Sequence, residues 1–172
     1  TELDKTIIEK ISDPLVHLVR NSIDHGIESP ALRTERNKPA TGNVKLNAYH
    51  ESGTIVIEVS DDGGGLNQNV ILQKAKANGL VSPEAELTAH EINQLIFEAG
   101  FSTADTVSNI SGRGVGMDVV RRNIEALRGT VELDSEYTVG TTVRIRLPLT
   151  LAIIDGFMMK VADAFYVVPL DI

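Results

Sequence analysis

The spacing of apolar residues predicts helices at the start of the chain. Four apolar residues recur there at helical intervals: Leu3, Ile7, Ile8 and Ile11. We expect Ser12-Asp13-Pro14 to end this helix, with Asp13 as N-cap and Pro14 as the first residue of a second helix. The second helix should end at Gly26. Its core-facing residues are expected to be Leu15, Leu18, Val19 and Ile23, with Val16 as a further candidate.

Strict alternation of apolar and polar residues predicts two pairs of strands. Residues 43–60 alternate on both sides of Ser52-Gly53, which is typical of a β-hairpin. Residues 130–137 and 141–149 alternate in the same way and are joined near Val139-Gly140. We therefore expect a sheet built largely from hairpins.

Further helices are predicted between and after these strands, at residues 67–79, 88–100 and 115–128. Thr88 and Glu91 have the spacing of a capping box, and Gly129 follows the last helix. Residues 29–42 should form a short helix and a loop. This order of elements indicates an α/β sandwich, a mixed and mostly antiparallel sheet with helices on one face, rather than a βαβ ladder.

The C-terminal residues 151–172 change in character. Residues 156–170 read as two short strands around Ala162-Asp163-Ala164, after an extended link. We interpret them as the first hairpin of a separate β domain. The alternative is that they extend the sheet of residues 1–150.

Composition excludes several classes of protein. The net charge is −8 and no Lys/Arg cluster forms a basic stripe, which argues against nucleic-acid binding. The chain has no cysteine, so Cys-ligated metals are excluded and a reducing, cytoplasmic location is expected. No apolar run approaches the roughly 20 residues that span a bilayer, so we expect no direct membrane insertion.

Two glycine clusters are the main candidates for chemistry. Asp61-Asp62-Gly63-Gly64-Gly65 follows a predicted strand, and Gly112-Arg113-Gly114-Val115-Gly116 precedes a predicted helix. Neither has the lysine of a P-loop, and Met117 breaks the spacing of a Rossmann fingerprint. Residues 100–114 have no periodicity, and a loop of that length is usually functional or disordered. The helix that follows would direct its N–H groups toward an anion.

Five segments in order resemble a known family. HLVRNSIDHGIE, DDGGGL, FEAGFST, GRGVGMDVV and GTTVRIRLPLTLAI are similar to the N, G1, F, G2 and G3 boxes of the histidine-kinase branch of the GHKL ATPase superfamily. Within that branch, the chemotaxis kinases are the most similar. The resemblance covers residues 3–154, and residues 155–172 resemble the start of a CheW-like regulatory β domain.

The resemblance implies a Bergerat-type ATP-binding fold with ATP and Mg²⁺ as cofactors. Asn21 would be the magnesium ligand, since an amide oxygen suits that hard cation. Asp61 would accept a hydrogen bond from the adenine amino group, while Gly63 and Gly65 let the backbone turn beneath the ring. Thr142 would complete the adenine pocket.

Residues 100–114 would form a lid over the triphosphate. Its expected phosphate-binding residues are Ser102, Thr103, Arg113, Gly114, Val115 and Gly116. His25 shares a face with Asn21 and is a further phosphate candidate. His17 occupies the position of the water-activating glutamate in hydrolytic relatives, so we expect it to assist proton transfer or to orient groups.

No histidine of the chain lies in a phospho-acceptor helix. The resemblance therefore implies transfer of the γ-phosphoryl group, in trans, to a histidine on a separate phosphotransfer domain. It also implies a homodimer with mostly upstream dimerisation helices, a CheW-type adaptor, chemoreceptors, and response regulators downstream. Two alternatives remain: an ATP-hydrolysing conformational switch, and a nucleotide-sensing scaffold without catalysis.

Overall fold

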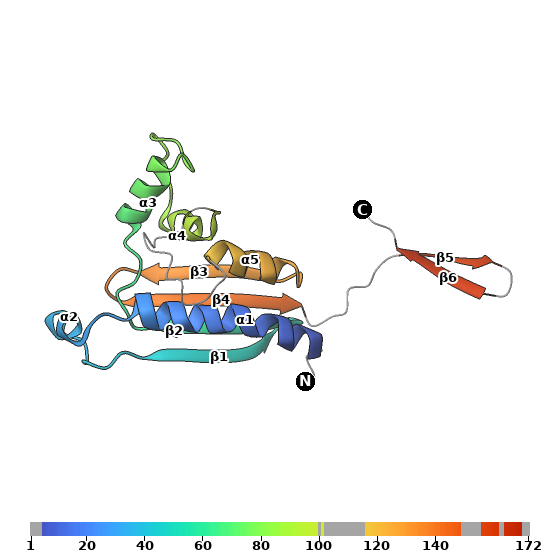
Figure 1. Ribbon diagram of the computed structural model, residues 1–172, viewed down its shortest axis with the longest axis horizontal. Helices are drawn as coiled ribbons and strands as arrows, with labels where there is room; N and C mark the ends of the chain where they lie inside the picture. The colour runs from blue at the N-terminus through green and yellow to red at the C-terminus, as the bar shows by residue number, and fades with distance from the viewer. Residues whose placement is uncertain (1–4, 100, 102–115, 149–155, 162–163, 170–172) are drawn as a thin grey trace.

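The computed structural model describes residues 5–99, 101, 116–148, 156–161 and 164–169 of the 172-residue chain. In chain order, the elements of Figure 1 are α1 (Lys5–Asn21), the π-helix η1 (Ser22–Gly26), α2 (Pro30–Glu35), β1 (Val44–Glu51), β2 (Thr54–Asp61), α3 (Gln68–Ala77), α4 (Ala89–Gln94), the 3₁₀-helix η2 (Leu95–Phe97), α5 (Met117–Glu125), β3 (Thr130–Glu136), β4 (Gly140–Pro148), β5 (Gly156–Val161) and β6 (Ala164–Pro169). Helices and strands therefore form where the apolar spacing predicts them.

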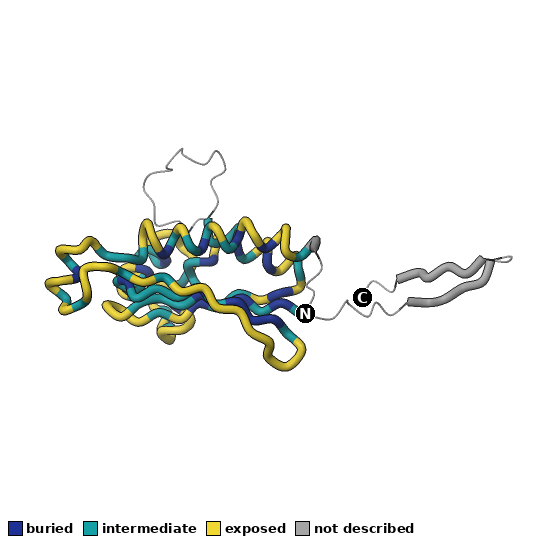
Figure 2. The backbone as a smooth tube through the Cα atoms, turned by 90° about the horizontal axis from the view of Figure 1, so that it is seen from below, coloured by how far each residue is buried: buried dark blue, intermediate teal, exposed yellow. Residues whose placement is uncertain are grey.

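Four strands form the main sheet in the order β1-β2-β4-β3. All three pairings are antiparallel, which confirms the predicted α/β sandwich with a mostly antiparallel sheet; no parallel pair occurs among the described strands. Helices α1 and α5 contribute to one core with residues from the inner face of the sheet, and Figure 2 shows the buried residues between these layers. Central members of this core are Leu18, Val59, Val120, Ile124 and Ile145.

Helix α1 runs unbroken from Lys5 to Asn21 although Pro14 lies inside it. The expected break at Ser12-Asp13-Pro14 is therefore absent. An internal proline removes a helix hydrogen bond and crowds the preceding turn, at a cost of about 3 kcal/mol. The Pro14 ring is less than 2% exposed, and Ile11 and Leu18 are buried on the same side of α1. Packing against the core offsets the cost of the proline.

The core-facing stripe of α1 is narrower than the sequence suggests. Leu18 is buried, but Val16 and Ile23 are 58% and 57% exposed, so the expectation for Ile23 is wrong. Helix α1 packs on β2 and α5, whereas nearly all of the edge strand β1 is exposed. Leu46 of β1 is 60% exposed and lines an open hollow beside α1. These apolar side chains lie beyond the reach of the core.

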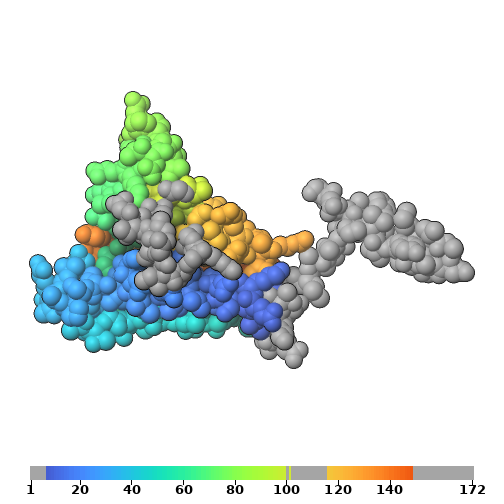
Figure 3. All heavy atoms as spheres, in the orientation of Figure 1, coloured from blue at the N-terminus to red at the C-terminus, as the bar shows by residue number. Residues whose placement is uncertain are grey.

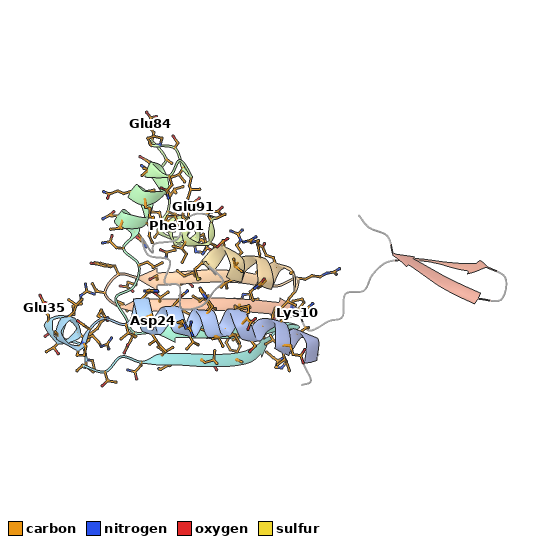
Figure 4. The ribbon with its side chains drawn as sticks, viewed as in Figure 1. Lys10, Asp24, Glu35, Glu84, Glu91 and Phe101 are labelled. Carbon is orange, nitrogen blue, oxygen red and sulfur yellow. The ribbon has the colours of Figure 1, made fainter. Side chains whose placement is uncertain are left out.

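Helices α3 and α4 form a second, smaller core. Thr88 and Glu91 make the expected capping box at the start of α4, where Glu91 N–H donates to Thr88 Oγ1 (3.3 Å) and Thr88 N–H to the Glu91 carboxylate (2.8 Å). Phe101 is 1% exposed and packs with Ile71 and Ile92 beside α4 (Figure 4). This contact anchors the point where the chain enters the glycine- and serine-rich segment.

Strands β5 and β6 form a two-stranded sheet of their own. This pairing confirms the predicted hairpin and shows that it does not extend the four-stranded sheet. Its assignment to a CheW-like domain stays a prediction. None of the helices in the described residues combines the length and the apolar character that crossing a bilayer requires.

Candidate functional site

The C-terminal end of α1 carries two of the polar residues that the sequence singles out. His17 and Asn21 are one helical turn apart and therefore lie on one face of the helix. Directly after Asn21 the helix widens into the π-turn η1, where Ile27 N–H donates to the Ser22 carbonyl at 2.8 Å. π-helical turns are rare in proteins, and those that occur are often found at functional sites. His25 lies in this turn and is exposed.

Asn21 connects α1 to α5, which lie side by side in Figure 3. Its Nδ2 donates to Sδ of Met117, the first residue of α5, at 3.2 Å. Because the amide NH₂ group is turned toward Met117, Oδ1 points away and has no partner among the described residues. Asn21 therefore presents a hard oxygen ligand at the end of α1.

That single oxygen fits a magnesium ion shared with phosphate groups. Within the described part of the chain, no three His, Asp or Glu side chains are grouped so that they could hold a metal. Mg²⁺ commonly takes one or two protein oxygens and completes its shell with water and substrate phosphates. The residues present are thus consistent with the sequence-based assignment of Asn21.

The carboxylate of Asp61 lies against the end of η1. Its Oδ1 accepts the N–H of Gly63 at 3.0 Å, and Gly64 N–H donates to the Gly26 carbonyl at 2.8 Å. A Cβ atom on Gly63 would lie 2.0 Å from that Gly26 oxygen, so only glycine fits there. The base-reading candidate Asp61 and the metal-ligand candidate Asn21 are thus brought to the same end of the α1–η1 helix.

Gly65 allows the β3–β4 hairpin to close over the same turn. Its φ is +63°, and a Cβ atom there would lie 2.1 Å from the carbonyl oxygen of Glu136. Thr138 N–H donates to the Gly64 carbonyl at 2.7 Å. The second glycine of the predicted motif is therefore required by a backbone contact as well as by its left-handed conformation.

The role of Thr142 in the adenine pocket stays a prediction. Its Oγ1 lies 3.0 Å from Oγ of Ser60, its cross-strand neighbour on β2. Asp61 pairs instead with Thr141 across the β2–β4 ladder. Because side chains alternate along a strand, Thr141 shares the face of Asp61. Both threonines line the cavity that Asp61 borders, so Thr141 is a further candidate for the adenine pocket.

A cavity opens at this end of the sheet. It has a volume of about 790 Å³, and the side chains that line it include Lys45, Ser60, Asp134 and Thr142. These four residues are cross-strand neighbours in one row of the sheet. Asp61 and Thr141 line the same cavity, so it includes the carboxylate that is expected to read the base.

A buried cluster of charges beneath the Asp61 turn was not anticipated from the sequence. Arg33 is 0% exposed and pairs with Glu28 and Asp62, each at 3.1 Å. Lys38 Nζ donates to Glu28 at 3.0 Å and to the carbonyls of Asp62 and Gly63 at 2.9 and 2.7 Å. The one feature of the sequence that could have predicted this cluster is the high number of charged residues within residues 28–38. The same feature is equally typical of a solvent-exposed loop.

The charges in this cluster are mutually stabilised. Burial acts to raise the pKa of the Glu28 carboxyl, but hydrogen bonds from Lys38, from the backbone and from Arg36 outweigh it and lower that pKa. Burial likewise acts to raise the pKa of Asp62, but hydrogen bonds from Asn43 and Arg33 bring it to about 2. Both carboxylates are therefore ionised under ordinary conditions.

Asp62 should make folding sensitive to acid. Its folded-state pKa of about 2 is below the ordinary 3.8, so its contribution to stability is present above about pH 4 and is lost as the pH falls through about 2. We expect Asp62→Asn to lower the free energy of unfolding at pH 6 by roughly 1–2 kcal/mol, because partial exposure screens the interaction. Urea titrations at several pH values should show the difference from wild type shrinking toward pH 2. A difference that does not change with pH would contradict this role.

His17 is suited to act as a neutral imidazole. Burial lowers its pKa below 6.5, and the charges of Arg20 and His25 lower it further. A neutral ring can accept a proton near neutral pH.

The expected lid lies largely outside the described residues. This applies to the predicted phosphate-binding residues Ser102, Thr103, Arg113, Gly114 and Val115, whose roles stay predictions. Gly116 is described and is the N-cap of α5. Since Asn21 contacts Met117, the start of α5 and the end of α1 meet at the same place. Gly116 therefore lies close to the Asn21 amide.

Comparison with known proteins matches most of the chain. Residues 10–151 match the family described as histidine kinase-, DNA gyrase B-, and HSP90-like ATPase. The chemotaxis protein CheA of Salmonella typhimurium is 55% identical over 99% of this chain and 25% of its own length. CheA of Bacillus subtilis is 51% identical over 99% of this chain and 26% of its own length. The chain thus spans about a quarter of the length of these relatives.

A solved structure has the same fold. The nucleotide-free catalytic domain of the histidine kinase ThkA superposes with a TM-score of 0.51 at 15% identity, covering 83% of this chain and 69% of that domain. At this level of identity, the likeness concerns the arrangement of helices on an antiparallel sheet and not the chemistry.

Proposed function

Because the chain belongs to the family of histidine kinase-, DNA gyrase B- and HSP90-like ATPases, we propose that it is the ATP-binding catalytic domain of a CheA-type histidine kinase. It would transfer the γ-phosphoryl group of ATP to a histidine on a separate phosphotransfer domain. The chemotaxis relatives, at 51–55% identity over nearly the whole chain, support this assignment.

The observation that carries the proposal is the convergence of Asp61 and Asn21. The Asp61 carboxylate lies against Gly26, five residues after Asn21, whose Oδ1 has no partner among the described residues. One nucleotide could therefore contact both residues, with its base at Asp61 and its phosphates toward Asn21. If Asp61 and Asn21 lay in different parts of the molecule, a single nucleotide could not contact both.

Each residue has a distinct task in the proposed reaction. Asp61 accepts a hydrogen bond from the adenine amino group, and Asn21 helps hold Mg²⁺ on the phosphates. The bound ion would neutralise phosphate charge and align the γ-phosphate for in-line attack. The N-terminus of α5 adds a favourable dipole near the phosphates.

His17 would act on the incoming nucleophile. When the unprotonated ring nitrogen of the acceptor histidine bonds to phosphorus and the bond to ADP breaks, the N–H of its other nitrogen becomes acidic, and a neutral imidazole nearby can accept that proton. The lowered pKa of His17 keeps the ring in this form near neutral pH. A glutamate at this position would activate water, so histidine favours transfer over hydrolysis.

The proposed partners follow from the same assignment. They are a phosphotransfer domain acting in trans, a CheW-type adaptor, chemoreceptors and response regulators, with the full-length protein a homodimer. No acceptor histidine is placed within this chain.

Transfer of label from ATP tests the proposal. The full-length protein, incubated with Mg²⁺ and ATP radiolabelled at the γ-phosphate, should label the histidine of a supplied phosphotransfer domain. The label should be labile to acid and stable to base, as expected for phosphohistidine. Rapid release of inorganic phosphate without a labelled acceptor would instead indicate a hydrolytic switch, and binding without either product would indicate a sensing scaffold.

A further inference from the structure

We propose that Lys38 is a positioning residue that makes the base pocket select adenine, an inference that rests on the proposed function. Lys38 does so by fixing the backbone of the Asp61–Gly63 turn from below. One carboxylate oxygen of Asp61 then remains in a fixed position, where it can accept a hydrogen bond from the amino group of the base.

All three hydrogens of the Lys38 ammonium have acceptors in the Asp61–Gly63 turn and in Glu28. Its three hydrogens match three acceptors: the Glu28 carboxylate at 3.0 Å, the Asp62 carbonyl at 2.9 Å and the Gly63 carbonyl at 2.7 Å. Its side chain is 16% exposed and that of Glu28 is 5% exposed. Charge-assisted hydrogen bonds in such surroundings are strong and directional.

Arg33 fixes Glu28 and the other side of the same peptide group. Its Nη1 donates to Glu28 at 3.1 Å and to the Asp62 carbonyl at 3.0 Å. The Asp62 carbonyl therefore accepts from two cations, which restricts rotation of the peptide unit between Asp62 and Gly63. That unit carries the N–H of Gly63.

The orientation of this N–H determines which Asp61 oxygen remains open. Gly63 N–H donates to Oδ1 at 3.0 Å, while Oδ2 has no hydrogen-bond partner among the described residues. In that part of the chain, the one buried side-chain oxygen or nitrogen without a partner is Asn93 Oδ1. Asp61 Oδ2 is therefore open to solvent as well as unpaired.

A single fixed carboxylate oxygen distinguishes between purines. Adenine carries an amino group at C6, which can donate to Oδ2. Inosine carries a carbonyl oxygen at the same carbon, which the carboxylate would repel. If the turn were free to rotate, Asp61 could move away from that carbonyl and the discrimination would weaken.

The experiment compares affinities of the full-length protein for ATP and inosine triphosphate by calorimetry with Mg²⁺. Lys38→Met keeps the aliphatic stem and removes the three hydrogen bonds, while Glu28 stays paired with Arg33 and Arg36. We expect the variant to bind ATP about tenfold more weakly and inosine triphosphate about as well as wild type. The ratio of the two affinities should therefore fall about tenfold.

Two variants serve as controls. Lys38→Arg keeps the charge and should restore part of the ratio. Lys10→Met makes the same substitution at an exposed site toward the opposite end of α1 from Asp24 (Figure 4), and it should leave both affinities and the melting temperature unchanged.

The outcomes separate the inference from the proposed function. Equal loss of affinity for both nucleotides in Lys38→Met, or no loss, would overturn the role of Lys38 while wild-type ATP binding still supports the function. Absence of ATP binding by the wild-type protein would overturn both.

Discussion

Replacing Asn21 by alanine is expected to lower phosphoryl transfer by about 10²–10³-fold while the protein remains folded. The large effect follows because Oδ1 of Asn21 is the one described oxygen at the end of α1 assigned to Mg²⁺. The small effect on folding follows because the side chain makes a single hydrogen bond, to the Met117 sulfur, and sulfur is a weak acceptor. Phosphorylation of a supplied acceptor, measured over a range of Mg²⁺ concentrations, checks the expectation.

A control substitution tests whether the loss of activity is specific to Asn21 or follows from replacing any asparagine of the domain by alanine. Asn123 lies exposed on α5, so Asn123→Ala should transfer phosphate at the wild-type rate. Thermal unfolding of both variants should be close to that of wild type. If Asn21→Ala phosphorylates the acceptor normally at low Mg²⁺, the metal assignment of Asn21 is wrong.

Local patterns were sufficient for the positions of most elements. The alternation around Ser52-Gly53 predicts the β1–β2 hairpin, and both turn residues have positive φ as the tight connection requires. The spacing of Thr88 and Glu91 likewise predicts a cap that depends only on residues three apart. Such features are encoded within a few residues, so they can be read without knowing the fold.

Predictions failed where tertiary packing decides the outcome. The helix through Pro14 persists because its ring is buried against the core, which a local rule cannot include. Ile23, in η1, is exposed beside Leu46 of the edge strand β1, and helical spacing alone does not show how wide a surface will cover the helix. The β2–β4 register, which pairs Asp61 with Thr141 and Ser60 with Thr142, joins residues at least 80 positions apart and could not be read from the sequence.

Some residues of the candidate site could be predicted from the sequence and others could not. Asp61, Gly63 and Asn21 are recognisable because their motifs are short and occur in a family order. The Arg33–Glu28–Lys38 cluster is invisible in the sequence, since its acceptors are backbone carbonyls about 25 residues further along the chain. Every residue has a backbone carbonyl, so the sequence does not show which carbonyls will accept hydrogen bonds from Arg33 and Lys38. These contacts are seen only in the structure.

Replacing Gly63 by alanine is expected to abolish measurable ATP binding and to destabilise the domain by about 3 kcal/mol or more. The added Cβ would lie 2.0 Å from the Gly26 carbonyl oxygen and 2.9 Å from Asp61 Oδ1. Both neighbours are fixed, one as backbone at the end of η1 and the other by its bond to Gly63 N–H. The turn and η1 must therefore move apart, which separates Asp61 from the end of α1.

The adjacent glycine provides the matched control for this prediction. A Cβ on Gly64 would meet its nearest atom, a terminal nitrogen of Arg36, at 3.4 Å, which is an ordinary contact with a flexible side chain. Gly64 also has no positive φ, so alanine brings no backbone strain there. Gly64→Ala should bind ATP and unfold much like wild type, measured by calorimetry and urea titration. If the two variants behave alike, the close packing of the turn against Gly26 does not hold the base-reading carboxylate in place, since only Gly63→Ala disturbs that contact.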